Sequence, residues 1–174
     1  MSMAKFALRG KMPITNYLQP IEFELAIKRL PAVQFFIQRA SIPAISMGFA
    51  TQPVMFNNVF HSPDKMDYSE FNITFIVDEK AENYIEVFDW MHGLAFPQSF
   101  SQYKNLNESE PSLYSDIILS IKNSAKKPNL RIHFKNAFPI SLSEVMLDTT
   151  QSDVIYPEAS VSFKYDSFTI SRSN

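Results

Sequence analysis

The chain has 174 residues, of which 45% are hydrophobic and 20% are charged, a composition that is ordinary for one folded domain. Its net charge of −2 gives no electrostatic case for a basic nucleic-acid-binding surface, and the absence of cysteine excludes a disulfide scaffold, a cysteine nucleophile and thiolate metal ligands. No run approaches the roughly 20 apolar residues of a membrane span, so we expect no membrane partner.

Residues 1–18 are expected to form an arm ahead of a single domain that covers residues 19–174. The arm contains Lys5, Arg9 and Lys11 but no continuous apolar core, which is not the pattern of a signal peptide. Two interpretations stay open, a flexible arm or an arm that becomes ordered only against a partner.

Two alternating runs follow. Residues 21–27 place Ile21, Phe23, Leu25 and Ile27 on one face, and residues 33–38 continue the alternation after a turn at 28–31. Together they predict a β-hairpin. The segment at residues 41–44, which contains Pro43, ends it.

Residues 41–68 read as a long excursion between core strands, with the form of a long hairpin. The run from Ile45 to Phe60 is apolar enough to pair, but it carries Gly48 and Pro53. Because proline cannot donate to a β-ladder, Pro53 is expected at an edge or a bulge.

Within residues 71–93 the spacing of the apolar side chains changes from the period of a strand to that of a helix. Phe71, Ile73, Phe75 and Val77 predict a half-buried strand. The apolar positions then recur at helical spacing, so a helix should follow with almost no loop, capped by Asp78 and ended by Gly93. The predicted apolar stripe consists of Ala81, Tyr84, Ile85, Phe88 and Met91.

Trp90 lies off this stripe, so it is either covered by the loop 94–110 or buried between subunits.

Three further strands are predicted at residues 113–122, 130–135 and 158–165, with an exposed turn at 123–129. Phe138 and Pro139 interrupt the region before residues 140–147, and Phe168 and Ile170 extend the last strand.

About seven strands and one main helix predict a mainly β (α+β) fold. Its architecture should be two packed antiparallel sheets that form a sandwich or barrel, with one flanking α-helix.

No catalytic or metal-binding constellation emerges. His61, His92 and His133 lie in a turn, at a helix end and in a strand, and no pair has the HxxxH spacing of a metal site. No serine lies in a GxSxG context, and the acidic pair Asp78 and Glu79 is better explained by helix capping than by catalysis. We therefore expect no enzymatic activity, no metal and no cofactor.

Large apolar side chains also occupy the nominal outer faces of several strands, among them Phe36 and Ile118. In a lone domain these faces would meet water, so burial against other chains is indicated. Closing several such sheets into a ring would also remove their exposed edges. The candidates for the contact between subunits or rings are Ile42, Pro43, Phe49, Met55, Phe56, Phe60 and Trp90.

Four short elements occur in order along residues 21–170. They are Ile42-Pro43-Ala44, then Val77-Asp78-Glu79 followed by Phe88-Asp89-Trp90, then Phe138-Pro139-Ile140-Ser141 before Leu147-Asp148, and a closing strand from Ala159 to Phe168 that contains Tyr165-Asp166. In this combination the chain resembles the tail-tube protein superfamily of contractile phage tails and related injection machines.

The resemblance implies a homo-hexamer, in which each subunit contributes strands to a continuous inner β-barrel. It also implies stacking on rings of itself or of other tail tube and baseplate proteins, with the tail sheath and the tape measure protein as further candidate partners. DNA would be only a transient cargo of the lumen, and the protein would be made in the host cytoplasm and end in the virion tail.

The superfamily has no catalytic residues to carry over. The arm and the basic turn 123–129, with Lys126 and Lys127, depart from the family pattern. Such additions distinguish initiator rings at the baseplate and terminator rings at the head end.

Two other functions stay open. A stand-alone binding module, such as a carbohydrate-binding β-sandwich, would use Trp90 and the aromatic loop 94–110 as its ligand surface. An enzyme would need a constellation that these residues do not supply, although a positive hydrolase screen would establish it.

Overall fold

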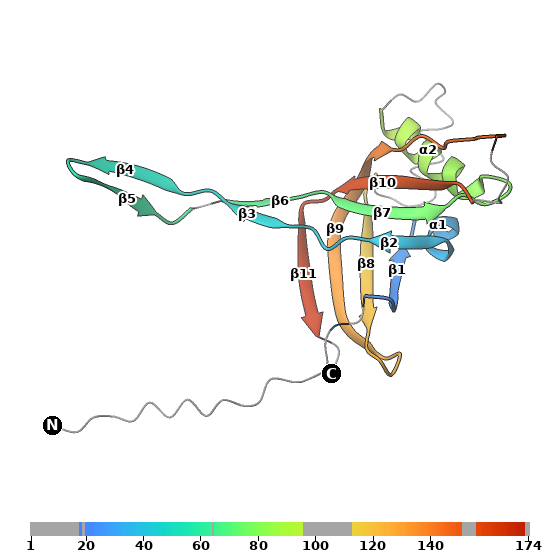
Figure 1. Cartoon of the computed structure of the whole chain (residues 1–174), viewed down its shortest axis with the longest axis horizontal. Helices are drawn as coiled ribbons and strands as arrows, with labels where there is room; N and C mark the ends of the chain where they lie inside the picture. The colour runs from blue at the N-terminus through green and yellow to red at the C-terminus, as the bar shows by residue number, and fades with distance from the viewer. Residues whose placement is uncertain (1–17, 19, 64, 96–112, 151–155, 173–174) are drawn as a thin grey trace.

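The computed structural model describes residues 18, 20–63, 65–95, 113–150 and 156–172, and Figure 1 shows their arrangement. The elements are β1 (Phe23–Ile27), α1 (Pro31–Phe35), β2 (Ile37–Ala40), β3 (Ile45–Met47), β4 (Ala50–Val54), β5 (Asn57–His61), β6 (Met66–Tyr68), β7 (Phe71–Ile76), α2 (Glu82–Ala95), β8 (Ser115–Lys122), β9 (Pro128–Leu142), β10 (Glu158–Lys164) and β11 (Ser167–Arg172).

The strand β9 joins two antiparallel layers. Its first part pairs with β8 and β11, and its last part pairs with β10. The full order is β1-β8-β9-β10-β7-β2, with β11 attached to β9. In Figure 1 the strands β1, β8, β9 and β11 run across the direction of β2, β7 and β10. The predicted architecture, two packed antiparallel sheets with a flanking helix, is confirmed.

The crossing point between the layers lies near Asn136, whose φ of 53° is in the left-handed region that asparagine tolerates better than most residues. The backbone N–H of Asn136 donates to Asp116 Oδ1 at 3.2 Å. Its side-chain Nδ2 donates to Asp166 Oδ2 at 2.6 Å. These two bonds hold β9 where it changes layers.

The core is built from alternate residues of the strands, as the period of two predicts. Phe71, Ile73 and Phe75 are buried, and Phe71 stacks on Phe134 with ring centroids 4.5 Å apart. Because Phe71 belongs to β7 and Phe134 to β9, this contact packs one layer on the other. Other buried alternating positions are Leu25, Ile27, Ile117, Leu119, Ile121, Ile132, Ala159, Val161, Phe163 and Tyr165.

The hairpin predicted from residues 21–27 and 33–38 is wrong. Strand β1 pairs with β8, and β2 pairs with β7. Between them residues 31–35 form the short helix α1, which begins with Pro31. Proline at the first turn of a helix has its φ already set, and this local preference prevails over the alternation.

The interruption expected at residues 138–139 is also wrong, because β9 runs through both residues. Pro139 pairs with Phe163 next to a register shift between Ser162 and Phe163. A proline fits there because a bulge leaves a ladder position without a required donor. Phe168 and Ile170 lie on β11, a separate strand that pairs with β9.

The helix α2 turns a different face to the core from the predicted stripe. Its buried residues are Asn83, Val87, Trp90 and Gly93, whereas Ile85 and Phe88 are exposed. Gly93 does not end the helix, which runs to Ala95. Tyr84 and Met91, partly buried, pack against the core at the edge of the true face.

The expected cap at Asp78 is also wrong, because α2 begins at Glu82 and Asp78 Oδ1 is buried with no hydrogen-bond partner. The junction is held instead by the buried Asn83. Its Nδ2 donates to the carbonyl of Ile76 at 2.7 Å, and its Oδ1 accepts the Asp78 backbone N–H at 3.4 Å.

Candidate subunit interface on the exposed hairpin

Residues 45–68 form a long antiparallel hairpin that projects from the body of the molecule (Figure 1). Its base is the pair β3 and β6, with Ile45 opposite Tyr68, and its outer part is the pair β4 and β5. Pro53 lies within β4, on a two-stranded ladder where each strand has one free edge, as expected for proline. The predicted excursion is therefore a hairpin.

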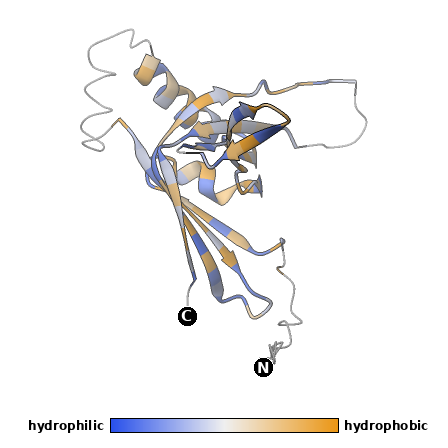
Figure 2. Cartoon of the chain, turned by 90° about the vertical axis from the view of Figure 1, so that its left-hand side faces the viewer, coloured by the Kyte–Doolittle hydropathy of each residue, from blue (hydrophilic) through white to orange (hydrophobic). Residues whose placement is uncertain are grey.

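Apolar side chains of the hairpin face solvent. Every residue of β3, β4 and β5 is exposed, and the tip residues Met55 and Phe56 have relative exposures of 88% and 94%. Figure 2 views the molecule from the hairpin side and shows hydrophobic stretches on these strands. Contiguous exposed apolar surface of this kind marks an interaction site in a folded protein.

The base of the hairpin is fastened to the core. The Tyr165 hydroxyl donates to the carbonyl of Ser69 at 2.8 Å, and the Tyr165 and Tyr68 rings lie 6.0 Å apart. Burial, with a smaller contribution from Tyr68, raises the pKa of Tyr165 to about 12. The phenol is therefore neutral and able to donate over the whole ordinary pH range, so the hairpin has a fixed root and a free tip.

Five of the seven candidate interface residues are exposed, and four of these lie on the hairpin. These four are Phe49, Met55, Phe56 and Phe60, and Ile42 lies just before β3. The Phe49 and Phe60 rings meet edge to face with centroids 5.5 Å apart.

The other two candidates, Pro43 and Trp90, are buried within the chain itself. Trp90 Nε1 donates to the carbonyl of Leu113 at 3.2 Å, and its ring lies 6.1 Å from that of Phe163. The Trp90 indole is thus part of the core, and it provides no exposed surface for a neighbouring chain or for a ligand.

The family model for phage tail tube proteins matches residues 3–171 of the chain. The chain belongs to the phage tail tube protein family. This confirms the resemblance to contractile-tail tube proteins. Its motifs lie before β3, between β7 and α2, on α2, on β9 and after it, and on β10 and β11.

Solved structures share the fold of this tail tube protein. A chain of the anti-feeding prophage cap, described as its tube terminating cap, aligns with a TM-score of 0.67 at 17% identity, covering 98% of this chain and 100% of that one. A chain of the sheath/tube terminator of an extracellular contractile injection system aligns with a TM-score of 0.65 at 18% identity, covering 91% and 99%.

A chain of the sheath-tube complex of the same kind of injection system aligns with a TM-score of 0.59 at 18% identity, covering 99% of the tail tube protein and 100% of that chain. No curated protein sequence matches the tail tube protein. Neither described helix is long and apolar enough to cross a membrane.

The histidines of the tail tube protein make separate contacts. His61 Nε2 lies 2.9 Å from Gln52 Oε1 on the hairpin, and His133 Nε2 lies 3.2 Å from Asp116 Oδ2 on β8. His92 stacks loosely on Phe88 of α2, with ring centroids 5.6 Å apart. Within the described ranges, no three acidic, histidine or cysteine side chains come together as a metal site.

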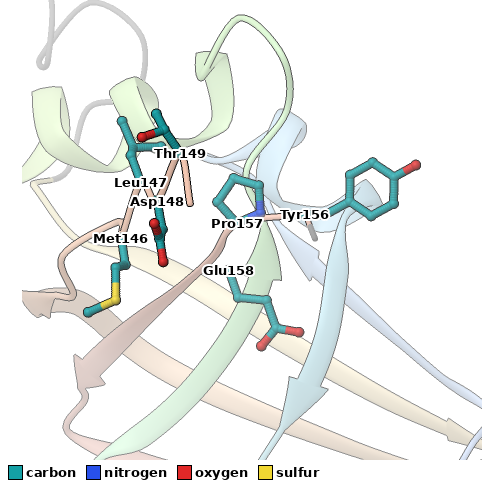
Figure 3. Close-up of a pocket in the computed structure, with 7 residues that line it drawn as sticks. All are labelled: Met146, Leu147, Asp148, Thr149, Tyr156, Pro157 and Glu158. Atoms are coloured by element: carbon teal, nitrogen blue, oxygen red, sulfur yellow. The ribbon is translucent and has the colours of Figure 1, made fainter. Parts of the chain in front are cut away.

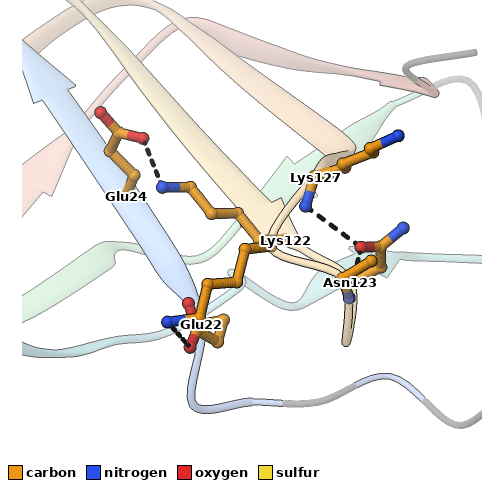
Figure 4. A network of polar contacts seen from close by, with 7 residues as sticks. Glu22, Glu24, Lys122, Asn123 and Lys127 are labelled. Carbon is orange, nitrogen blue, oxygen red and sulfur yellow. Dashed lines mark hydrogen bonds and ion pairs between the residues drawn. The ribbon is translucent and has the colours of Figure 1, made fainter.

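The basic turn between β8 and β9 is exposed, as predicted, and Lys126 of the turn and Lys122 at the end of β8 form ion pairs (Figure 4). Lys126 Nζ lies 3.8 Å from Glu22, and Lys122 Nζ lies 3.0 Å from Glu24 on β1. The Asn123 side chain accepts the Lys127 backbone N–H at 3.1 Å and shapes the turn. These pairs balance part of the positive charge that the sequence places there.

The candidate list missed other exposed apolar residues of the same hairpin. They are Ile45, Met47, Val54, Val59 and Met66. The mixed run from Ile45 to Phe60 carried the signal, but a two-stranded ribbon exposes both of its faces. The alternation that separates inside from outside in a core strand therefore has no meaning there.

Proposed function

We propose that the chain is a structural subunit of a phage tail or tail-like particle. It forms hexameric rings that stack into, initiate or cap the inner tube through which DNA is ejected. Family membership supports the structural tail role. The folds shared with a tube terminating cap, a sheath/tube terminator and a tube chain support a place within or at the end of the tube.

The observation that carries the proposal is the exposed apolar hairpin. A monomer would leave Phe49, Phe56 and Phe60 in water, together with the open edges of β4 and β5. Burying an aromatic side chain of this kind contributes about 1.5–3 kcal/mol. Packing the hairpin on neighbouring subunits would recover that energy several times over, once for each copy in a ring.

The net charge of −2 suits a conduit for DNA, since a channel that bound phosphates would slow the passage of its cargo. The proposed partners are further copies of the chain, other tail tube and baseplate proteins, the tail sheath and the tape measure protein. No catalytic activity is proposed. The alternative of a carbohydrate-binding module is not favoured, because its ligand surface required the Trp90 indole, which is buried.

Assembly of the purified chain tests the proposal. Negative-stain imaging and sedimentation at high protein concentration should show rings or short tubes for the wild type, and Phe56→Asp should prevent them while the chain stays folded. Phe88→Asp is the matched control, because Phe88 is an exposed phenylalanine on the outer face of α2. Wild-type protein that remains a stable monomer, with no rings in particles, would sink the proposal.

A further inference from the structure

A second feature of the surface is an apolar groove at the junction of β7 and α2, away from the hairpin. Its cavity volume is about 1150 Å³, and its apolar walls include Phe36, Ile76, Val77, Tyr84 and Val145. A smaller hollow of about 540 Å³ adjoins it and shares Leu147, Tyr156 and Pro157 (Figure 3). Together they form one continuous recess between the segments that follow β9 and precede β10.

The charged side chains of the groove are all acidic. They are Asp78, Glu79 and Glu144, and no lysine or arginine lies among the described residues of its walls. Asp78 Oδ1 is buried and has no hydrogen-bond partner. A buried acceptor without a donor costs about 1–3 kcal/mol, so this groove favours an occupant that brings N–H or O–H donors.

The adjoining hollow continues the same character. Asp148 and Glu158 line it, alongside Met146. The Thr150 hydroxyl and then the Thr150 backbone N–H donate to Asp148 Oδ1, at 2.6 and 2.8 Å, and hold the pKa of that carboxyl below its usual range. The whole recess thus combines apolar walls with acidic side chains.

We propose that this recess holds residues 1–17 of a second copy of the chain. The proposal rests on the assembly proposed above and names one of its contacts. The sequence of residues 1–17 contains Lys5, Arg9 and Lys11 and no acidic residue, which complements the carboxylates. The same segment carries Phe6, Leu8, Met12 and Ile14 for the apolar walls.

A second copy is favoured over the chain's own segment by reach. The residues just before β1 lie beside the β8–β9 turn, where the Lys122 backbone N–H donates to the Glu22 carbonyl at 2.8 Å. The recess lies past the other end of β9, whose 15 residues span roughly 50 Å along the strand. Residues 1–17 reach about 56 Å at full extension, and β9 changes direction near Asn136 (Figure 1). The chain's own segment would therefore use a large part of its length to follow β9 to the recess, whereas the segment of a second copy has no such path to cover.

The contact is heterologous, because it joins the beginning of one copy to the β7–α2 junction of the next. A contact of this kind repeats from copy to copy and closes into a ring or continues as a stack. The contact also gives residues 1–17 a binding partner. This agrees with the interpretation that the arm becomes ordered only against a partner.

Cysteine cross-linking tests the proposal in the full-length chain, which has no natural cysteine. Two differently tagged single-site variants, Leu8→Cys and Leu147→Cys, are mixed, assembled and treated with a mild thiol oxidant. We expect a disulfide between the two tagged copies, and loss of most of this product when Lys5, Arg9 and Lys11 are changed to glutamate. Adding Glu79→Lys and Glu144→Lys to the acceptor copy should then restore it.

Met55→Cys, at the hairpin tip, is the matched control for each partner. A product of Met55→Cys with Leu147→Cys, in place of the Leu8→Cys product, would overturn the proposal by making the hairpin the occupant. A third protein carries both Leu8→Cys and Leu147→Cys in one chain. An intramolecular disulfide in this double variant under dilute conditions would overturn the proposal by showing that the chain's own segment occupies the recess. Rings without a cross-link would overturn this contact alone, whereas the absence of rings would overturn the proposed function.

Discussion

At the scale of single residues, Tyr165 decides how firmly the hairpin is rooted. Its hydroxyl is buried and donates to the Ser69 carbonyl, directly after β6. Tyr165→Phe should lower the free energy of unfolding by about 0.5–1.5 kcal/mol, since a single neutral hydrogen bond is lost. Tyr156→Phe is the matched control, because Tyr156 is exposed, and chemical denaturation measures both.

The same residue predicts an alkaline loss of stability. The pKa of Tyr165 rises from 10.0 to about 12 on folding, so the unfolded chain releases its proton first. The stabilisation that comes from this difference in the pKa of Tyr165 is complete below pH 10 and is lost as the pH rises through about 12. Wild type should therefore lose more stability than Tyr165→Phe between pH 9 and pH 12, and equal slopes for the two proteins would contradict this.

Phe75 is fully buried in β7 and pairs across to Ala159 and Ile37. Phe75→Ala should destabilise the chain by about 3–5 kcal/mol, because a large core side chain leaves a cavity. The exposed Phe35→Ala should change stability by less than about 0.5 kcal/mol. Thermal unfolding followed by circular dichroism compares the two, and a wild-type melting temperature for Phe75→Ala would mean that the register of β7 is wrong.

The residues of the strands could be placed from sequence better than those of the helix. Phe71, Ile73 and Phe75 follow the strict period of two, and one face of a covered sheet must be inside. On α2 the apolar residues surround the helix more widely, so the sequence did not reveal that Trp90 and Gly93 face the core. That choice depends on what α2 packs against, including the Phe163 ring.

At the scale of elements, positions were more predictable than partners. The strands at residues 71–76, 115–122 and 158–164 lie where alternation indicates. The partner of β1 could not be predicted, because it pairs with β8 about 90 residues later, while a local hairpin fits the pattern equally well. The short helix α1 could not be predicted either, since its five residues are too few for a helical spacing of apolar residues to be recognised.

The hairpin should be dispensable for the fold. Beyond β3 and β6, its strands β4 and β5 pair only with each other. Replacing residues 48–65 with an Asn-Gly turn keeps Met47 opposite Met66, and a two-residue type I′ turn fits this spacing. The melting temperature should change by no more than about 2 °C, while rings no longer form. A large loss of thermal stability would show that the hairpin is part of the folding unit.

At the scale of the whole molecule, the shared strand β9 makes the two layers one cooperative unit. If β9 leaves, β8, β10 and β11 each lose a strand partner and the two layers lose the strand that joins them. We expect one unfolding transition, seen at the same denaturant concentration by far-ultraviolet circular dichroism and by the fluorescence of Trp90, the single tryptophan. Fluorescence that changes well before the dichroism would show that α2 detaches first.

The fold class was accessible from sequence because its evidence is distributed over the chain, in the strands, in α2 and in the ordered motifs of the tail tube family. The interface was only partly accessible. Phe56 and Phe60 could be suspected as outer-face residues and are exposed, whereas Pro43 and Trp90, also named as candidates, are covered by contacts within the chain. The acidic recess could not be foreseen, because its walls come from four separate segments.

The place of β9 in the sheet has a further consequence for the order of events during synthesis. Strands β10 and β11, made after all the other described strands, flank β9, and among these strands β10 is the one that connects it to β7. The two layers therefore cannot close until the chain has been made through β10, although the apolar hairpin has emerged long before. Nascent chains truncated before residue 158 should bind general chaperones and resist productive release, because the apolar hairpin and the unpaired core strands are then exposed together.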